Sequence, residues 1–209
     1  MPICMKEGLG YRTTEIAGDP TILNLLRQEH RLVDRFLLAL YKFSKQFQKE
    51  RDLGTESFNR FVDKAVQFLA VELAGMHQEK EETLLAALKE EGLVPTDGVL
   101  DFIPREHANK RRFVRVLLKA VTRYTRHGGK FAIIHLVVNA AHYGRQLSDH
   151  MCKEEATLFP VARELSAGAQ QELVMQFQAI DLKACRIAPG DMPDVLRQME
   201  RERRRTMRC

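Results

Sequence analysis

A short run of charged residues is written twice in this chain, once in each half. Residues 77–82 read His-Gln-Glu-Lys-Glu-Glu, and residues 150–155 read His-Met-Cys-Lys-Glu-Glu. Each copy follows another histidine in a similar triplet, Gln-Glu-His at residues 28–30 and Arg-Glu-His at residues 105–107, at nearly the same distance along the chain. The pattern of a histidine and then His-x-x-x-Glu is therefore used twice. Four imidazoles and two carboxylates on four helices are enough to hold two metal ions.

Turn signals divide most of the chain into four long helices with short connections. Asp19-Pro20 pairs an N-cap aspartate with a proline suited to the first helical position, so a helix is predicted at about 20–51. Further helices are predicted at about 55–91, from between 98 and 105 to 127, and at about 130–165. The predicted fold is all-α, an antiparallel up-down-up-down four-helix bundle. The repeat makes the bundle two helical hairpins related by a pseudo-twofold axis.

The bundle is predicted to occupy residues 20–166, between an irregular N-terminal segment at 1–19 and a helical extension at 167–209. Two shorter helices are expected in the extension, at about 169–184 and 192–207. The chain ends in a basic tail, for which a solvated helix end is favoured over a nucleic-acid contact. Its clustered arginines are Arg201, Arg203, Arg204, Arg205 and Arg208.

The composition agrees with a single helical domain of this size. The chain has 209 residues, 44% of them hydrophobic, and no tryptophan. We find no signal-peptide core and no apolar stretch long enough to span a membrane. The four cysteines include no C-x-x-C pair, which favours free thiols. We therefore expect a cytoplasmic protein without a membrane partner.

The second histidine of each half shares a helix face with a glutamate. Positions four apart on an α-helix differ by only about 40° around the axis, so His77 points with Glu81 and His150 with Glu154. The stripe around His77 is apolar, and the stripe around His150 is mixed. A glutamate on such a face is costly unless it is paired or metal-bound. The apolar residues predicted on the His77 face are Val66, Ala70, Leu73, Ala74, Leu84 and Leu88.

The same geometry places the remaining histidines and the neighbouring residues. His30 and His107 also lie in apolar stripes, where a single histidine is more often an ordinary core residue than a ligand. Four of them at duplicated spacing, two with a carboxylate one turn later, favour a metal site. The following glutamates, Glu82 and Glu155, are expected to face water, and Cys152 is expected to point away from the metals.

The ligand types favour two iron ions over a single structural zinc. Imidazole suits several transition metals, whereas carboxylate suits harder ions. A zinc ion in a closed tetrahedral site needs only four ligands and would leave part of this set unused. The carboxylate-rich di-iron bundles of the ferritin type use Glu-x-x-His, which differs from this pattern in order and spacing.

The ordered residues resemble the hemerythrin-like HHE cation-binding domain family over about residues 20–166. The similarity extends to Lys-Glu-Glu in the first run and to the segment 153–160, Lys-Glu-Glu-Ala-Thr-Leu-Phe-Pro. The resemblance implies two iron ions with an oxo or hydroxo bridge, and carboxylates that bridge the two ions. It also implies a four-histidine form, whereas oxygen-carrying hemerythrin uses five. The implied ligands are His30, His77, Glu81, His107, His150 and Glu154.

Several residues near these ligands have two interpretations. Tyr143 lies two turns before His150 and is a candidate for lining the cavity above the irons, although an ordinary core tyrosine is the simpler interpretation. Asp34 and Arg111 are related by the repeat and would either pair across the bundle or lie at its surface. Gln146 would hydrogen-bond a ligand or serve a structural role, and His142 is expected at the bundle edge.

We therefore predict a non-haem di-iron protein that binds a small ligand such as dioxygen, peroxide or nitric oxide, in an oxygen, redox or nitrosative response. A binding or sensing module and a peroxide- or nitric-oxide-handling oxidoreductase are both compatible with this site. The alternative is a metal-dependent interaction protein whose C-terminal helices dock a protein partner or a second copy of the chain.

Overall fold

The computed structural model describes most of the chain as helix. The described residues are 20–49, 56–93, 98–127, 130–187, 197–198 and 200–201, and none of them forms a strand. The irregular segment predicted at 1–19 and most of the last predicted helix and basic tail lie outside these residues. No described helix combines the length and the apolar content needed to cross a membrane.

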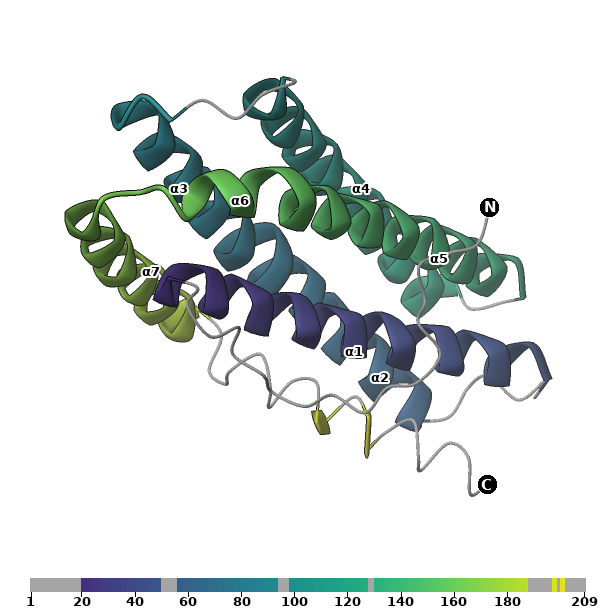
Figure 1. Cartoon of the computed structure of the whole chain (residues 1–209). Coiled ribbons are helices and arrows are strands. Elements are labelled where there is room, and N and C mark those ends of the chain that lie inside the picture. The colour runs from purple at the N-terminus through teal and green to yellow at the C-terminus, as the bar shows by residue number, and fades with distance from the viewer. Residues whose placement is uncertain are drawn as a thin grey trace.

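Four long helical rods form the bundle, and they run antiparallel to their neighbours in the chain (Figure 1). The all-α four-helix bundle predicted from the turn signals is confirmed. The second and fourth rods are each composite, because a π-helical segment interrupts them. The rods are α1 (Thr21–Lys49), then α2 (Glu56–Gln67), η1 (Phe68–His77) and α3 (Gln78–Glu90), then α4 (Val99–His127), and last α5 (Lys130–Lys153), η2 (Glu154–Leu158) and α6 (Phe159–Ala162).

The π-helical segment η1 changes which residues of the second rod face the core. A π turn holds more residues than an α turn, so residues before η1 are rotated relative to those after it. Leu84 and Leu88 are buried on the His77 face, as the regular helix predicts. Phe68 and Leu69, which a regular α-helix places off this face, are buried as well. The side chains predicted on this face at 66, 70, 73 and 74 lie outside those described.

Among the described side chains, the core consists of two apolar clusters separated by a polar layer. On α1, His30 lies between Leu26 of one cluster and Val33 of the other. We call the cluster toward the α4–α5 connection the distal cluster; it includes Phe36, Phe61, Phe68, Val114, Leu117 and Tyr143. The proximal cluster includes Ile22, Leu23, Leu84, Ile103, Phe159 and Phe177.

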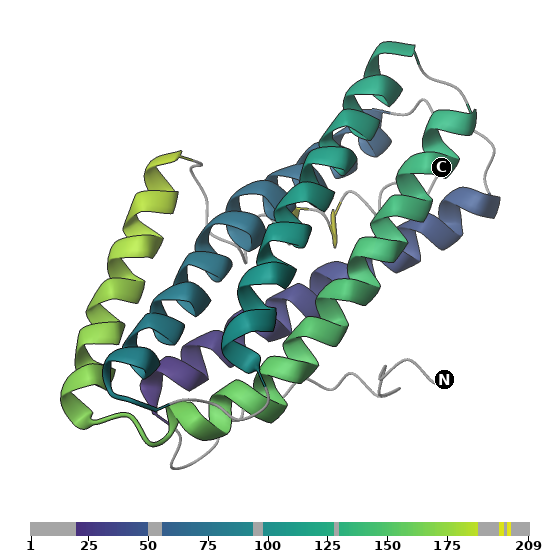
Figure 2. The ribbon, with the colours of Figure 1, turned by 90° about the horizontal axis from the view of Figure 1, so that it is seen from above.

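A further helix, α7 (Ala167–Ile187), packs against the bundle beside α1, η1 and α3 (Figure 2). It is longer than the helix predicted at 169–184. Leu173 and Phe177 are fully buried and belong to the proximal cluster, so α7 completes the core at this end. Ser166 donates its backbone N–H to Glu91 Oε2 at 2.9 Å, which fixes the turn before α7.

The packing of α7 predicts a large stability loss for Phe177→Ala. The ring is fully buried, so the change should lower the free energy of unfolding by about 3–5 kcal/mol. Urea denaturation followed by circular dichroism measures this loss. Met175→Ala, on the exposed side of α7, should change it by about 0.5 kcal/mol or less. A small effect of Phe177→Ala would mean that the bundle folds independently of the extension.

Candidate metal centre

Six buried side chains from the four rods meet in the polar layer between the two apolar clusters. They are the six residues that the repeated pattern singled out. Their ligand atoms form two groups, and within each group all atoms lie within 4.8 Å of one another. One group contains His30, His77 and both glutamates; the other contains His107, His150 and the same two glutamates, Glu81 and Glu154. Each group could hold one metal ion, and each helical hairpin supplies both histidines of one group.

Each of the two glutamates places one oxygen in each group. Glu81 Oε1 lies 2.7 Å from His77 Nε2, and Glu81 Oε2 lies 2.7 Å from His107 Nε2. Glu154 Oε1 lies 2.7 Å from His150 Nε2, whereas its Oε2 lies 3.5 Å from His30 Nε2. Both carboxylates therefore span the two groups, which is the arrangement needed to bridge two ions.

The inward atoms of these side chains form no hydrogen bond within the described structure. They comprise the Nε2 atoms of the four histidines and both oxygens of each glutamate, all inaccessible to solvent. Burying polar atoms without partners costs free energy, and a buried carboxylate costs much more. Imidazole nitrogens and carboxylate oxygens together suit iron and other first-row transition metals. The donor set therefore fits a pair of such cations.

The outward nitrogen of every one of these histidines donates a hydrogen bond to a further carboxylate. His77 Nδ1 donates to Glu29 at 2.7 Å, and His150 Nδ1 donates to Glu106 at 2.6 Å. Since a carboxylate only accepts, these bonds leave the Nε2 lone pair facing inward once the ring is neutral. Carboxylates in this position orient histidine ligands and raise their basicity.

The other two histidines take their carboxylates from the end of the repeated run. His107 Nδ1 donates to Glu82 at 3.0 Å, and His30 Nδ1 donates to Glu155 at 2.8 Å. The prediction that Glu82 and Glu155 face water is correct for their exposure, because their side chains are 44% and 45% exposed. The prediction missed their hydrogen bonds to histidines on other helices, because these bonds depend on how the helices pack and not on the face that a residue occupies on its own helix.

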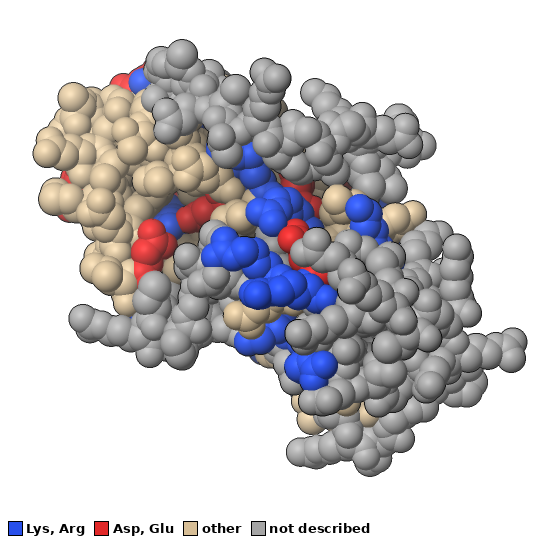
Figure 3. Space-filling model, turned by 90° about the horizontal axis from the view of Figure 1, so that it is seen from below, with Lys and Arg blue, Asp and Glu red and all other residues tan. Residues whose placement is uncertain are grey.

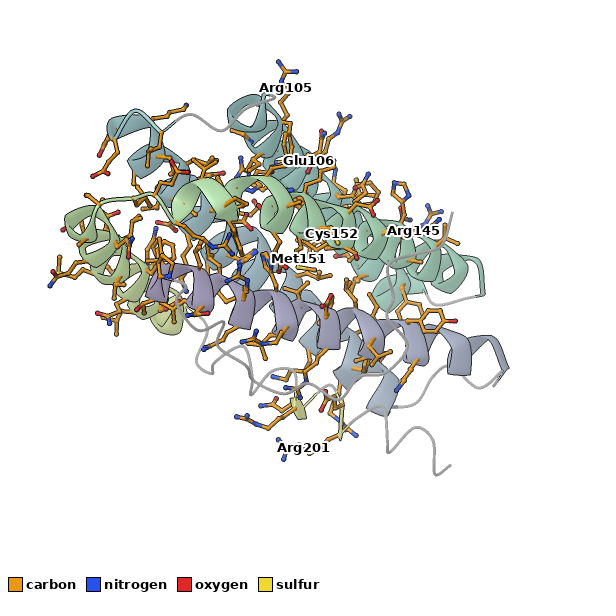
Figure 4. All side chains as sticks on the ribbon, viewed as in Figure 1. Arg105, Glu106, Arg145, Met151, Cys152 and Arg201 are labelled. Carbon is orange, nitrogen blue, oxygen red and sulfur yellow. The ribbon has the colours of Figure 1, made fainter. Side chains whose placement is uncertain are left out.

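The lysine of each repeated run binds the carboxylate before the first histidine. Lys80 binds Glu29, and Lys153 binds Glu106. Glu106 points toward α5, while the adjacent Arg105 points away from the bundle (Figure 4). The two halves differ in surroundings, because the Lys80 side chain is 3% exposed and the Lys153 side chain is 51% exposed. The histidine, the lysine and the two glutamates that the two runs share therefore either belong to the donor groups or hydrogen-bond to those groups or to residues that hold them in place.

In the metal-free protein the buried pairs shift the pKa of several groups. Burial alone would lower the pKa of His77, but the charge of Glu81 and the hydrogen bond to Glu29 raise it to about 10. Burial would likewise lower the pKa of His150, yet the adjacent carboxylates of Glu154 and Glu81 raise it to about 9. Burial would raise the pKa of Glu81, but the positive charges of His77 and Lys110 hold it well below the ordinary value.

Two polar side chains beside the donor groups have buried atoms with no hydrogen-bond partner among the described residues. One is Tyr143, which is 1% exposed and whose hydroxyl has no partner there. Its burial was expected both for a residue that lines the cavity and for an ordinary core tyrosine. The other is Lys110, which is 2% exposed and was not predicted. The sequence contained a signal for Lys110: it stands three residues after His107, and the equivalent position in the first half, three residues after His30, is the apolar Val33.

Other residues near the predicted site lie away from it. Gln146 is exposed and shares a hydrogen bond with His142 at 3.2 Å, so the structural role of Gln146 and the edge position of His142 are confirmed. Arg111 donates to Glu82 at 2.9 Å and to Gln78, and it does not pair with Asp34. Cys152 is exposed, as predicted.

Comparison with known families identifies the class of protein. The family model described as the hemerythrin HHE cation-binding domain matches residues 21–162. The chain belongs to this family, and the resemblance inferred from the repeated runs is confirmed. Comparisons with curated proteins and with solved structures gave no match. Family and donor groups together indicate metal binding, with iron as the metal that the family suggests.

The raised pKa values of His77 and His150 predict that metal loading releases protons. In the metal-free protein both imidazoles remain protonated up to their pKa values of about 10 and about 9. A metal ion must displace these protons, so near pH 7.5 about two protons should leave from these groups. Apparent affinity for Fe²⁺ should rise with pH and level off once both groups have titrated. Anaerobic calorimetry in buffers of different ionisation enthalpy measures the release.

Glu29→Gln provides the control for this prediction. The variant weakens the hydrogen bond that helps to raise the pKa of His77, so fewer protons should be released per loaded chain. Glu79→Gln, at an exposed position on α3 that contacts Lys183, should behave as wild type. A heat of binding that is independent of the buffer would contradict the protonation of His77 and His150 in the metal-free protein.

Proposed function

We propose that this protein holds two iron ions and binds a small ligand at them, in an oxygen, redox or nitrosative response. His30 and His77 would hold one ion, and His107 and His150 the other. Glu81 and Glu154 would bridge the pair. When bound, the ions would supply redox-active cations with coordination positions left for a small molecule.

The observation that carries this proposal is the division of each carboxylate between the two histidine pairs. A structural site for one cation needs a single closed set of donors. Here the donors form two equal sets that share only the two glutamates. Two imidazoles and two shared carboxylate oxygens per ion do not complete an octahedral shell, so room remains for a bridging group and a ligand.

The residues of this chain would hold, orient and isolate the ions. The Nδ1 hydrogen bonds fix each imidazole plane, and the apolar clusters on both sides exclude water from the shared interior. The Phe159 ring stacks on His30 at 5.6 Å, which closes the proximal side at that histidine. A stable spectrum with bound ligand would favour a binding or sensing protein, and turnover of hydrogen peroxide would favour an enzyme.

The test is metal analysis of protein purified without chelator, in wild type and in Glu81→Gln. Wild type should contain about two irons per chain, and Glu81→Gln should contain fewer than about one, because one shared anionic ligand is lost from both groups. The optical spectrum of the wild type should show charge-transfer bands of iron.

The matched control is Glu79→Gln, two residues earlier and exposed, which should retain full iron content. Far-ultraviolet circular dichroism must show that Glu81→Gln remains helical. One zinc per chain and no colour in the wild type would overturn the proposal, as would unchanged iron content in Glu81→Gln.

A second candidate function rests on the contact between α7 and the centre. Lys80 Nζ lies 2.6 Å from Asp181 Oδ1 on α7 and also binds Glu29, which accepts the hydrogen bond of His77. The corresponding Lys153 is exposed. On α7, Met175 and Leu182 are 52% and 65% exposed, so this helix offers apolar side chains to a protein partner or a second copy. Metal state would then control how firmly α7 is held.

This alternative predicts that iron protects α7 from amide hydrogen exchange. Loading should slow exchange in residues 167–187 of the wild type, and the slowing should be lost in Asp181→Asn, which weakens the link to Lys80. Lys183→Met, which removes only the exposed contact with Glu79, is the control. Equal exchange in the loaded and metal-free proteins would exclude control through α7.

A further inference from the structure

We propose that Lys110 and Tyr143 form a polar wall on the distal side of the two donor groups, where they hold a small anionic ligand by hydrogen bonds. This inference rests on the proposed function, because it names the class of ligand that the iron centre would take. Of dioxygen, peroxide and nitric oxide, peroxide is the one that is available as an anion, hydroperoxide.

The two side chains lie on the same side of the centre. Lys110 follows His107 by one turn of α4, toward the connection with α5, and Tyr143 precedes His150 on α5, toward that same connection. Both lie among distal-cluster residues, because Val114 follows Lys110 on α4 and Tyr143 is itself a member. The helices α4 and α5 pack side by side (Figure 2). In the proposed arrangement, one small ligand on this side would lie between α4 and α5 and accept from both groups.

Neither polar end has a partner among the described residues. Lys110 Nζ and Tyr143 Oη are solvent-inaccessible and form no hydrogen bond there. Leaving such donors unpaired is costly, and buried polar groups normally have a partner in the functional state. Their N–H and O–H groups are donors, so the missing partner must accept hydrogen bonds, as a small anion does.

The charges that act on both groups place them near the bridging carboxylates. Burial lowers the pKa of Lys110, and the charges of Glu81 and Glu154 oppose that shift. Burial raises the pKa of the Tyr143 hydroxyl, and the charge of Glu81 raises it further, so this group stays a donor at neutral pH. Both side chains thus feel the same carboxylate, Glu81.

The repeat shows that the bundle does not need a lysine at this position. Val33 occupies the corresponding place on α1, and it is fully buried in the distal cluster. On the proximal side, the residues one turn beyond the glutamates are apolar and fully buried, as with Leu84 and Leu158. Among the described side chains, the polar wall is therefore found on one side of one half, which is expected of a ligand site and not of general packing.

A band of basic side chains on the outside does not offer an equivalent site. Figure 3 shows Lys and Arg side chains gathered on one face, but acidic side chains lie among them. On the surface of the bundle, Arg35 pairs with Glu200 at 3.0 Å. In contrast, Lys110 Nζ and Tyr143 Oη are buried and have no hydrogen-bond partner among the described residues.

The experiment compares the affinity of iron-loaded variants for an anionic and a neutral probe. Azide is titrated into the oxidised protein and nitric oxide into the reduced protein, each followed by the optical spectrum. Lys110→Met should weaken azide binding by about tenfold or more, because a charged donor is lost. Nitric oxide affinity should stay within about threefold of the wild-type value, because the neutral probe gains little from a cation. Tyr143→Phe should weaken azide binding by about two- to tenfold.

Lys119→Met, at an exposed position on the same helix, is the control and should match the wild type for both probes. Azide affinity that is unchanged in Lys110→Met overturns the proposal, even if iron uptake changes, since Lys110 would then only balance the buried carboxylates. If Lys110→Met loads too little iron to titrate, Tyr143→Phe and Lys110→Arg decide. Unchanged azide affinity in Tyr143→Phe, or loss of it in Lys110→Arg, overturns the proposal.

Failure of the proposed function gives a different result. If the wild type and Lys119→Met both lack iron, the di-iron assignment itself is wrong. If both contain about two irons per chain and bind azide, but Lys110→Met binds it equally well, only the anion site is wrong.

Discussion

The burial of two glutamates in the middle of an apolar bundle is the constraint on which the rest of the structure depends. Glu81 and Glu154 are 1% and 0% exposed, and their oxygens face imidazole nitrogens and not water. Such groups persist in a folded chain only where positive charge compensates them. In the metal-free protein protonated imidazoles and Lys110 supply that charge, and in the proposed holo-protein two cations would replace the imidazole protons. The four outer carboxylates then hold the imidazoles in place.

The sequence predicted the bundle and the convergence of the six candidate ligands because both depend on local periodicity. His77 and Glu81 share a face in any α-helix, and the duplicated order indicated that the two hairpins are equivalent. The comparison confirms the family, while the assignment of the six residues as iron ligands stays a prediction. The hydrogen bonds of Glu82 and Glu155 could not be predicted from one helix, because they depend on how neighbouring rods are rotated against each other.

Departures from the repeat carry information that the repeat itself hides. Lys110 stands where the first half has Val33, so the two hairpins bring equal donor sets but unequal surroundings. Lys80 is covered by α7, whereas its counterpart Lys153 is exposed to solvent. The repeat predicts the candidate donors that the two halves share, but not the side chains by which the halves differ. Comparing the repeats position by position would have identified Lys110 without a structure.

The π-helical segment η1 rotates the residues of α2 around the helix axis relative to those of α3. Residues 78–90 keep the orientation that Glu81 requires, while residues 56–67 are turned to suit the distal end. Removing one residue within 68–76 would restore regular α-helical winding and still leave Phe61 and Val62 facing the interior, because the π turns take up a residue more than α turns would. The π segment therefore lets this rod carry an additional residue while both its candidate donors and its apolar side chains stay in the interior.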